Sequence, residues 1–148
     1  SYAATAIIAN FLMAHAVLSA RGPKVLLGLD HNVSPREDLA KYGEKMVQAG
    51  KMTRQQLRRL IRWESAHANA VENFPMFFGS VLMALHAGVP NGTVNGLCLI
   101  FTLVRIGHAV AYIMTENVQL SYIRSLFWWA GNFTCFTLLG LAGKQLNA

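Results

Sequence analysis

The chain has 148 residues, which is enough for one domain. Its residues are 53% hydrophobic and only 14% charged, whereas a soluble domain usually carries about 25% charged residues, so an ordinary soluble fold is excluded. The formal net charge is +6, but eight of the thirteen Lys and Arg lie between residues 30 and 62. Because these basic residues form one segment between apolar blocks, with few aromatic residues among them, the charge does not indicate a nucleic-acid partner.

Four apolar blocks are long enough to cross a membrane as helices, which takes about 20 residues each. We place these spans at about residues 3–29, 62–89, 94–115 and 120–141. The first span contains Arg21, Pro23 and Lys24, where we expect it to leave the bilayer. Turn-forming residues at 89–92 and a short link at 115–117 separate the last three spans. The sequence therefore predicts an all-α fold, an integral membrane four-helix bundle with a single domain over residues 1–148.

The loop at residues 30–61 carries most of the basic residues, so it is predicted to face the cytosol, with both termini in the lumen. Ser34 followed by Pro35 and two acidic residues predicts a helix start in this loop. Thr53 with Gln56 three residues later resembles a capping box. That box predicts that the second helix begins before the membrane and projects from it.

The second span contains polar residues that are costly at membrane depth, by about 2.5–3.5 kcal/mol for an ionisable group. Ser65, Asn69, Glu72 and Asn73 fall within about 100° of one another on a helix and form one stripe. Two more residues, Glu64 and His67, lie on roughly the opposite side, where they could interact with each other.

The third span repeats this pattern with Arg105, His108 and Tyr112 at helical spacing, and the fourth adds Arg124 and Ser125. We expect the acid of the second span, Glu72, to compensate the two arginines across helices. Hydrogen bonds that only hold the bundle together are one interpretation. A pocket for an anionic polar ligand beside lipid is the other, and the number of ionisable groups favours it.

Other polar or reactive residues carry less information. The tandem tryptophans 128 and 129 are interpreted as facing lipid or packing inside the bundle. The two cysteines, Cys98 and Cys135, lie in apolar blocks and are interpreted as core residues. No His, Cys, Asp or Glu cluster has the spacing of metal ligands, so no metal site is predicted.

Two helix motifs resemble those of a known family, the MAPEG proteins (membrane-associated proteins in eicosanoid and glutathione metabolism). His67-Ala68-Asn69-Ala70-Val71-Glu72-Asn73-Phe74-Pro75 resembles the second-helix signature of that family. Arg105-Ile106-Gly107-His108-Ala109-Val110-Ala111-Tyr112 is similar to the third-helix motif of its microsomal glutathione transferase and microsomal prostaglandin E synthase branch. The segment 34–39 is similar to the loop of the same branch, and the resemblance covers nearly the whole chain.

The resemblance implies a homotrimer of four-helix subunits in the endoplasmic reticulum or a related membrane. It also implies glutathione held between subunits and a lipophilic co-substrate that arrives from the bilayer. Residues that would bind glutathione are Asn69 and Glu72, with His108 and Tyr112 from the neighbouring subunit, and further candidates are Arg105 and His67. Residues that would act in catalysis are Arg124, which would stabilise the thiolate, and Ser125, which would donate to the sulfur, together with Arg105 and Tyr112.

The chain departs from the family pattern at two positions where many members carry arginine, Ser65 and Ala68. Arg62 could partly replace them, and Arg21 or Lys24 could stand for an arginine of the first helix. The leading hypothesis is a glutathione-dependent transferase, peroxidase or isomerase acting on a lipophilic electrophile. One alternative is glutathione-independent isomerisation or cyclisation of a lipophilic metabolite, with Glu72, His108 and Tyr112 as acid–base residues. Another is a non-enzymatic lipid-binding partner protein.

Overall fold

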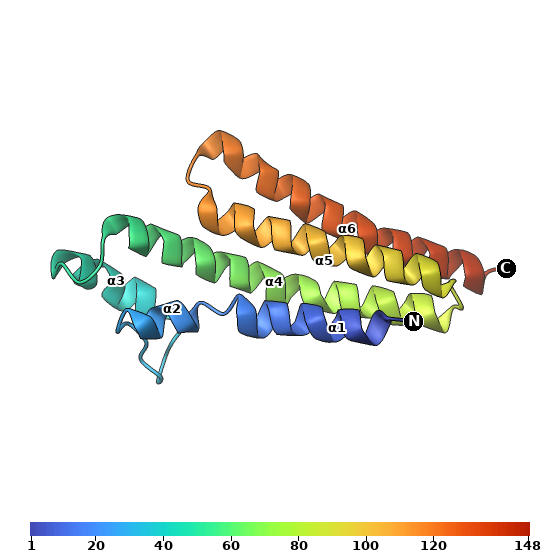
Figure 1. Ribbon diagram of the computed structural model, residues 1–148, viewed down its shortest axis with the longest axis horizontal. Coiled ribbons are helices and arrows are strands. Elements are labelled where there is room, and N and C mark those ends of the chain that lie inside the picture. Colours follow the sequence, from blue (N-terminus) through green and yellow to red (C-terminus); the bar gives the residue numbers. More distant parts are fainter.

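All 148 residues are described by the computed structural model, which is helical throughout and contains no strand. Figure 1 shows four segments lying side by side, namely α1, α4, α5 and α6, with α2 and α3 gathered at one end. The elements in chain order are α1 (Ala3–Leu12), the π-helical turn η1 (Met13–Val17), α2 (Arg21–Leu26), α3 (Asp38–Gln48), α4 (Arg54–His86), α5 (Asn91–Met114) and α6 (Val118–Leu146).

Three stretches are long and apolar enough to cross a membrane, namely Ala3–Leu26, Asn91–Met114 and Val118–Leu146. They correspond to the first, third and fourth predicted spans. The predicted second span lies in α4 except for its last three residues. Helix α4 has 33 residues but is not apolar enough to join the three stretches. Large apolar side chains such as Leu99 and Leu126 are 60% and 70% exposed on α5 and α6, as expected for surfaces that face lipid.

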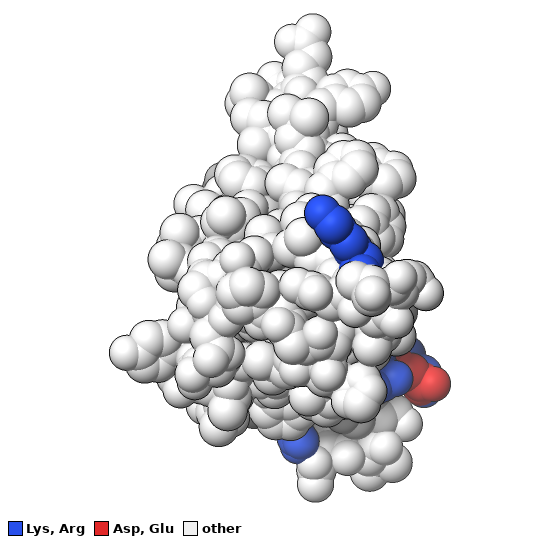
Figure 2. All heavy atoms as spheres, turned by 90° about the vertical axis from the view of Figure 1, so that its right-hand side faces the viewer, with Lys and Arg blue, Asp and Glu red and all other residues white.

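The largest core cluster lies between α4, α5 and α6. Phe77 stacks on Phe101 with ring centroids 4.1 Å apart, and Val81, Val94 and Leu138 pack around them with no exposed surface. The end of the molecule that holds both termini and the α4–α5 connection is almost free of charged atoms (Figure 2). The basic residues of the loop gather at the opposite end, so the bundle is electrically asymmetric along its length.

The start of α4 confirms the predicted capping box. The Gln56 N–H donates to Thr53 Oγ1 at 3.1 Å, and the Thr53 N–H donates to Gln56 Oε1 at 2.8 Å. Two orphan donors of the first turn are thereby satisfied. The helix begins at Arg54, eight residues before the predicted membrane boundary.

The predicted helix start at Ser34 and Pro35 is wrong, because α3 begins only at Asp38. The intervening residues are held in turns by contacts that are distant in sequence. The His31 N–H donates to the Asp38 carboxylate at 2.9 Å, and Lys24 Nζ donates to the Pro35 carbonyl at 2.5 Å. These bonds occupy the Pro35 carbonyl and the Asp38 carboxylate, both of which would belong to the first turn of a helix that starts at Ser34.

The two predicted short connections differ in outcome. Residues 115–117 form the link between α5 and α6, as predicted. The turn before α5 lies slightly earlier than predicted, because Pro90 is already the N-cap of α5. Gly88, with φ of 75°, makes that turn in a conformation that favours glycine.

Candidate functional site

The polar residues of α4 divide between two faces of that helix. One face meets α5 and α6, and the other meets α2 and the loop before α3. We call the first group the Asn69 cluster, consisting of Asn69, Arg105, His108, Tyr112, Arg124 and Ser125. We call the second group the Glu72 cluster, consisting of Lys24, Arg36, Glu64, His67 and Glu72.

Arg105 joins α5 to α4 within the Asn69 cluster. It is only 3% exposed, and its Nη2 donates to Asn69 Oδ1 at 2.7 Å. Asn73 supports this geometry, because its Nδ2 donates to the Asn69 carbonyl at 2.9 Å. The second terminal nitrogen of Arg105, Nη1, is buried without a partner, so hydrogen-bonding capacity remains at this position.

An aromatic and cationic group continues the cluster towards α6. His108 is 2% exposed and meets Tyr112 edge to face, with ring centroids 5.6 Å apart. The Arg124 guanidinium carbon lies 4.1 Å from the centroid of the Tyr112 ring, a cation–π contact. His108 Nδ1 is buried without a partner, which makes it the second unused polar atom of the cluster.

These side chains border one cavity of about 260 Å³, which brings five of the predicted site residues together within a single chain. The residues that line it are Asn69, His108, Tyr112, Arg124, Ser125, Trp128 and Trp129. The sequence interpretation missed the two tryptophans. Their spacing was a usable signal, because Trp128 follows Arg124 by four residues and therefore lies above it on the same helix face.

The Glu72 cluster borders a separate cavity of about 530 Å³ between α2 and α4. Its central contact is an ion pair in which Lys24 Nζ lies 2.5 Å from Glu64 Oε1. The Lys24 side chain is 4% exposed and also donates to the Pro35 carbonyl, so it joins α2, the loop and α4. His67 and the exposed Glu72 line the same cavity.

Two expected pairings are wrong. Glu64 pairs with Lys24, and no hydrogen bond or ion pair joins it to His67. Glu72 makes no ion pair with Arg105 or Arg124. Three residues turn a helix by about 300°, so Glu72 lies about 60° around α4 from Asn69 and beyond the contact with α5.

Arg62, which was proposed to replace the missing arginines in part, also lies elsewhere. Arg62 turns towards the α5–α6 connection, where its Nε donates to the Ile113 carbonyl at 3.0 Å and its Nη2 to Glu116 Oε1 at 2.9 Å. It does not line the cavity of the Asn69 cluster. The Ser65 hydroxyl donates to the Ile61 carbonyl of its own helix at 3.0 Å. The cavity beside Asn69 therefore contains no guanidinium from α4.

The Asn69 cluster suits an anionic or thiol-bearing ligand. One arginine lies over an aromatic ring at the cavity, and a second arginine supports the cavity wall from behind. A guanidinium stabilises a thiolate or carboxylate, and amide, hydroxyl and imidazole groups supply hydrogen bonds. No group of three or more His, Cys, Asp and Glu is placed to hold a metal ion.

Comparison with known proteins identifies one family. The chain matches the MAPEG family over residues 1–144, which is nearly its full length. No curated protein and no solved structure matches the chain. The match agrees with the two helix motifs, which contribute Asn69, His108 and Tyr112 to the Asn69 cluster and His67 and Glu72 to the Glu72 cluster. It also agrees with the three membrane-spanning stretches of an integral membrane protein. This chain therefore belongs to the MAPEG family.

Proposed function

We propose that this protein is a glutathione-dependent membrane enzyme, a transferase, peroxidase or isomerase acting on a lipophilic electrophile. The observation that carries the proposal is the cavity that Asn69, His108, Tyr112, Arg124 and Ser125 border together. The MAPEG family includes glutathione-dependent transferases and isomerases. Within that family, a cavity of this chemistry beside apolar helix surfaces favours a polar thiol and a lipid-soluble partner.

The residues present fit glutathione. That tripeptide offers carboxylates and amides as acceptors and a thiol that an adjacent cation makes more acidic. The buried nitrogens Arg105 Nη1 and His108 Nδ1 have no partner in the chain. An unpaired buried polar group costs about 1–3 kcal/mol, so a ligand that pairs with His108, which lines the cavity, would recover that energy.

The proposed roles follow from position. Asn69, held by Arg105, would bind and orient the peptide part of glutathione at the α4 side of the cavity. Arg124 and Ser125 would lie near the thiol, where the guanidinium favours its ionised form and the hydroxyl donates a hydrogen bond. Bound glutathione would supply the nucleophilic sulfur. Tyr112 would hold Arg124 in place through its ring.

The Glu72 cluster supports a proposal about assembly. Glu72 is exposed in the isolated chain, although it lies in a helix that packs among membrane-spanning segments. We infer that the protein is a homotrimer in which the Glu72 face of one subunit closes over the Asn69 cavity of its neighbour. In this arrangement α4 also crosses the membrane, in addition to the three apolar stretches. The membrane is that of the endoplasmic reticulum, and the basic loop faces the cytosol. Glu72 and His67 would then reach glutathione from the second subunit.

The test is glutathione binding to the detergent-purified protein by calorimetry, followed by thiolate absorbance. We expect Asn69→Ala to abolish measurable binding, because it removes the acceptor of Arg105. We expect Arg124→Ala to bind glutathione with loss of thiolate absorbance. Ser65→Ala, one turn before Asn69, is the matched control and should change neither, because its hydroxyl bonds only to its own helix.

A specific observation supports a second candidate. The cavity beside Asn69 receives no arginine from α4, so a ligand carboxylate would find fewer partners there. That arrangement favours glutathione-independent isomerisation or cyclisation of a lipophilic metabolite, with His108 and Tyr112 in acid–base roles. Absence of binding at millimolar glutathione, together with thiol-independent turnover that Tyr112→Phe stops, would replace the first proposal with this one.

A further inference from the structure

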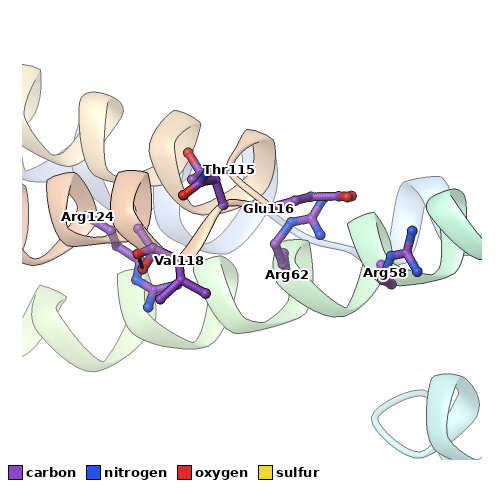
Figure 3. Close-up of a pocket in the computed structure, with 8 residues that line it drawn as sticks. Arg58, Arg62, Thr115, Glu116, Val118 and Arg124 are labelled. Atoms are coloured by element: carbon purple, nitrogen blue, oxygen red, sulfur yellow. Dashed lines mark hydrogen bonds and ion pairs between the residues drawn. The ribbon is translucent and has the colours of Figure 1, made fainter.

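A third polar cavity lies at the connection between α5 and α6, and we call it the arginine hollow. Its volume is about 450 Å³, within the range of about 300–1,000 Å³ that is common for ligand sites. Its lining residues are Arg58, Arg62, Thr115, Glu116, Asn117, Val118, Ser121 and Arg124. Figure 3 shows that two of the arginines come from α4 and the third from α6.

The charge of the hollow is not neutralised within the chain. Three guanidinium groups face one carboxylate, and only Arg62 uses that carboxylate, at 2.9 Å from Glu116. Arg58 and Arg124 make no ion pair. Arg62 is further fixed by the Ile113 carbonyl, so one guanidinium is held in place while two remain available. This arrangement favours a compact anion with several acceptor oxygens.

The lining also excludes an apolar occupant, because Val118 is its only hydrophobic residue. Guanidinium groups bind phosphate oxygens in bidentate geometry, and three of them match a phosphate monoester better than a single carboxylate. The Thr115 hydroxyl adds a neutral donor at the same place, whereas the Ser121 hydroxyl donates to the Val118 carbonyl at 2.6 Å. The chemistry of the hollow therefore points to a phosphate group.

The surroundings of the hollow point to a lipid as the source of that phosphate. On α6, beside and beyond the hollow, Tyr122 is 68% exposed and Leu126 is 70% exposed, and the two side chains lie within about 40° of each other on the helix. This exposed apolar surface runs along α6 from beside the hollow to beyond it. A phosphate in the hollow would place an attached acyl chain along α6, on the surface that faces the bilayer interior.

We propose that the arginine hollow binds the phosphate headgroup of an anionic membrane lipid whose acyl chain lies along α6. Arg58 and Arg62 belong to the hollow alone, because they do not line the cavity of the Asn69 cluster. Arg124 borders both cavities. A lipid phosphate in the hollow thus contacts the same guanidinium that faces the Asn69 cavity.

The experiment measures binding of a fluorescently labelled phosphatidic acid to the full chain in dodecyl maltoside micelles, by fluorescence anisotropy. Labelled phosphatidylcholine, whose head carries no net charge, is the comparison lipid. We expect phosphatidic acid to bind at least about tenfold more tightly than phosphatidylcholine, and Arg58→Gln to remove about tenfold of that affinity. Arg59→Gln is the matched control, because Arg59 is adjacent on α4 but contacts Met114 and does not line the hollow.

Each other outcome overturns the proposal. Equal affinity for the two lipids, or equal loss in Arg58→Gln and Arg59→Gln, would show that the hollow does not select a phosphate head. Displacement of the labelled lipid by inorganic phosphate at the same concentration would identify a soluble anion as the occupant. Loss of glutathione binding in Arg58→Gln would assign the hollow to the glutathione site, and would leave the proposed enzymatic function standing.

Discussion

Similar residue types lie against the two faces of α4, but they differ in how far their polar atoms are paired. On the face towards α5 and α6, Arg105 and His108 are almost fully buried and each keeps one polar atom without a partner. On the opposite face, Lys24 is equally buried, but Glu64 and the Pro35 carbonyl both engage its ammonium group. The comparison shows that burial of a charge alone does not identify a site. Unused hydrogen-bonding capacity beside a cavity is the more informative feature.

The largest effect on activity should come from the face towards α5 and α6, where buried polar atoms lack partners. We expect Arg124→Leu to lower kcat/KM for a lipophilic aryl halide with glutathione by about 10³-fold, because a preorganised cation at a developing charge is worth several kcal/mol. The melting temperature should hardly change, since Arg124 makes no ion pair. Arg124→Lys retains a charge and should recover part of the rate. A Leu variant with wild-type rate would remove Arg124 from the chemistry.

On the other face the largest effect should be on stability. We expect Lys24→Met to destabilise the protein by about 3 kcal/mol, because it leaves the Glu64 carboxylate without its partner in a partly buried position. Thermal unfolding in detergent measures this change. The double variant Lys24→Met with Glu64→Gln should regain part of the loss. If the double variant is no more stable than the single variant, the ion pair does not fasten α2 to α4.

The close approach of α5 and α6 behind the Asn69 cluster provides a third test. A Cβ at Gly107 would lie 2.7 Å from the ring of Phe127, so Gly107→Ala forces either that ring or the two helices to shift. We expect a loss of about 2 kcal/mol in thermal unfolding, within the range for overpacking. Gly140→Ala on α6 is the matched control, because nothing lies within 4 Å of its added Cβ. Equal melting temperatures for the two variants would contradict the close packing.

A smaller effect should link the two faces across subunits. Under the proposed trimer, Glu72→Gln should weaken glutathione binding by about tenfold, because a neighbour's cavity loses one charged contact. Calorimetry measures the change, and Glu44→Gln in α3 supplies a control acid outside both clusters. Unaltered binding in Glu72→Gln would separate the Glu72 face from the ligand and remove the main support for the composite site.

The smallest effect on stability should come from the exposed pair of Glu44 in α3 and Arg54 at the start of α4. Arg54 holds the pKa of the Glu44 carboxyl below its usual value by a side-chain hydrogen bond. A carboxyl whose pKa falls on folding stabilises the protein above its unfolded pKa, and this contribution is lost as the pH falls through the folded value. We therefore expect Glu44→Gln to lower the melting temperature slightly at neutral pH. The difference from the wild type should vanish in acid, below about pH 4. A difference that persists there would have another origin.

Much of the architecture could be predicted from the sequence, because each feature depends on neighbouring residues. Long apolar runs bounded by turn residues locate α5 and α6, and Thr53 with Gln56 marks the start of α4. Family membership was predicted from two motifs, one of nine residues and one of eight, and it is confirmed over residues 1–144. Helical spacing also brought Arg105, His108 and Tyr112 onto one face.

The partners of the charged residues could not be predicted, because they depend on the rotation of one helix against another. Glu72 lies on the same sequence stripe as Asn69, yet the seam between α4 and α5 separates them. Lys24 was expected to mark the bilayer boundary, and its carboxylate partner lies forty residues away. Trp128 was interpreted as facing lipid or packing inside the bundle, because a tryptophan pair gives no indication of direction.

The π-helical turn η1 bears on the direction in which the side chains at the start of the first helix point. Leu18 donates its N–H to the Met13 carbonyl, five residues back, at 2.9 Å, so the turn holds one residue more than a regular α-helical turn. Such a turn takes up a single inserted residue without breaking the helix. The extra residue turns every side chain before residue 13, Asn10 among them, by about 100° relative to the side chains after residue 17, compared with an uninterrupted α-helix.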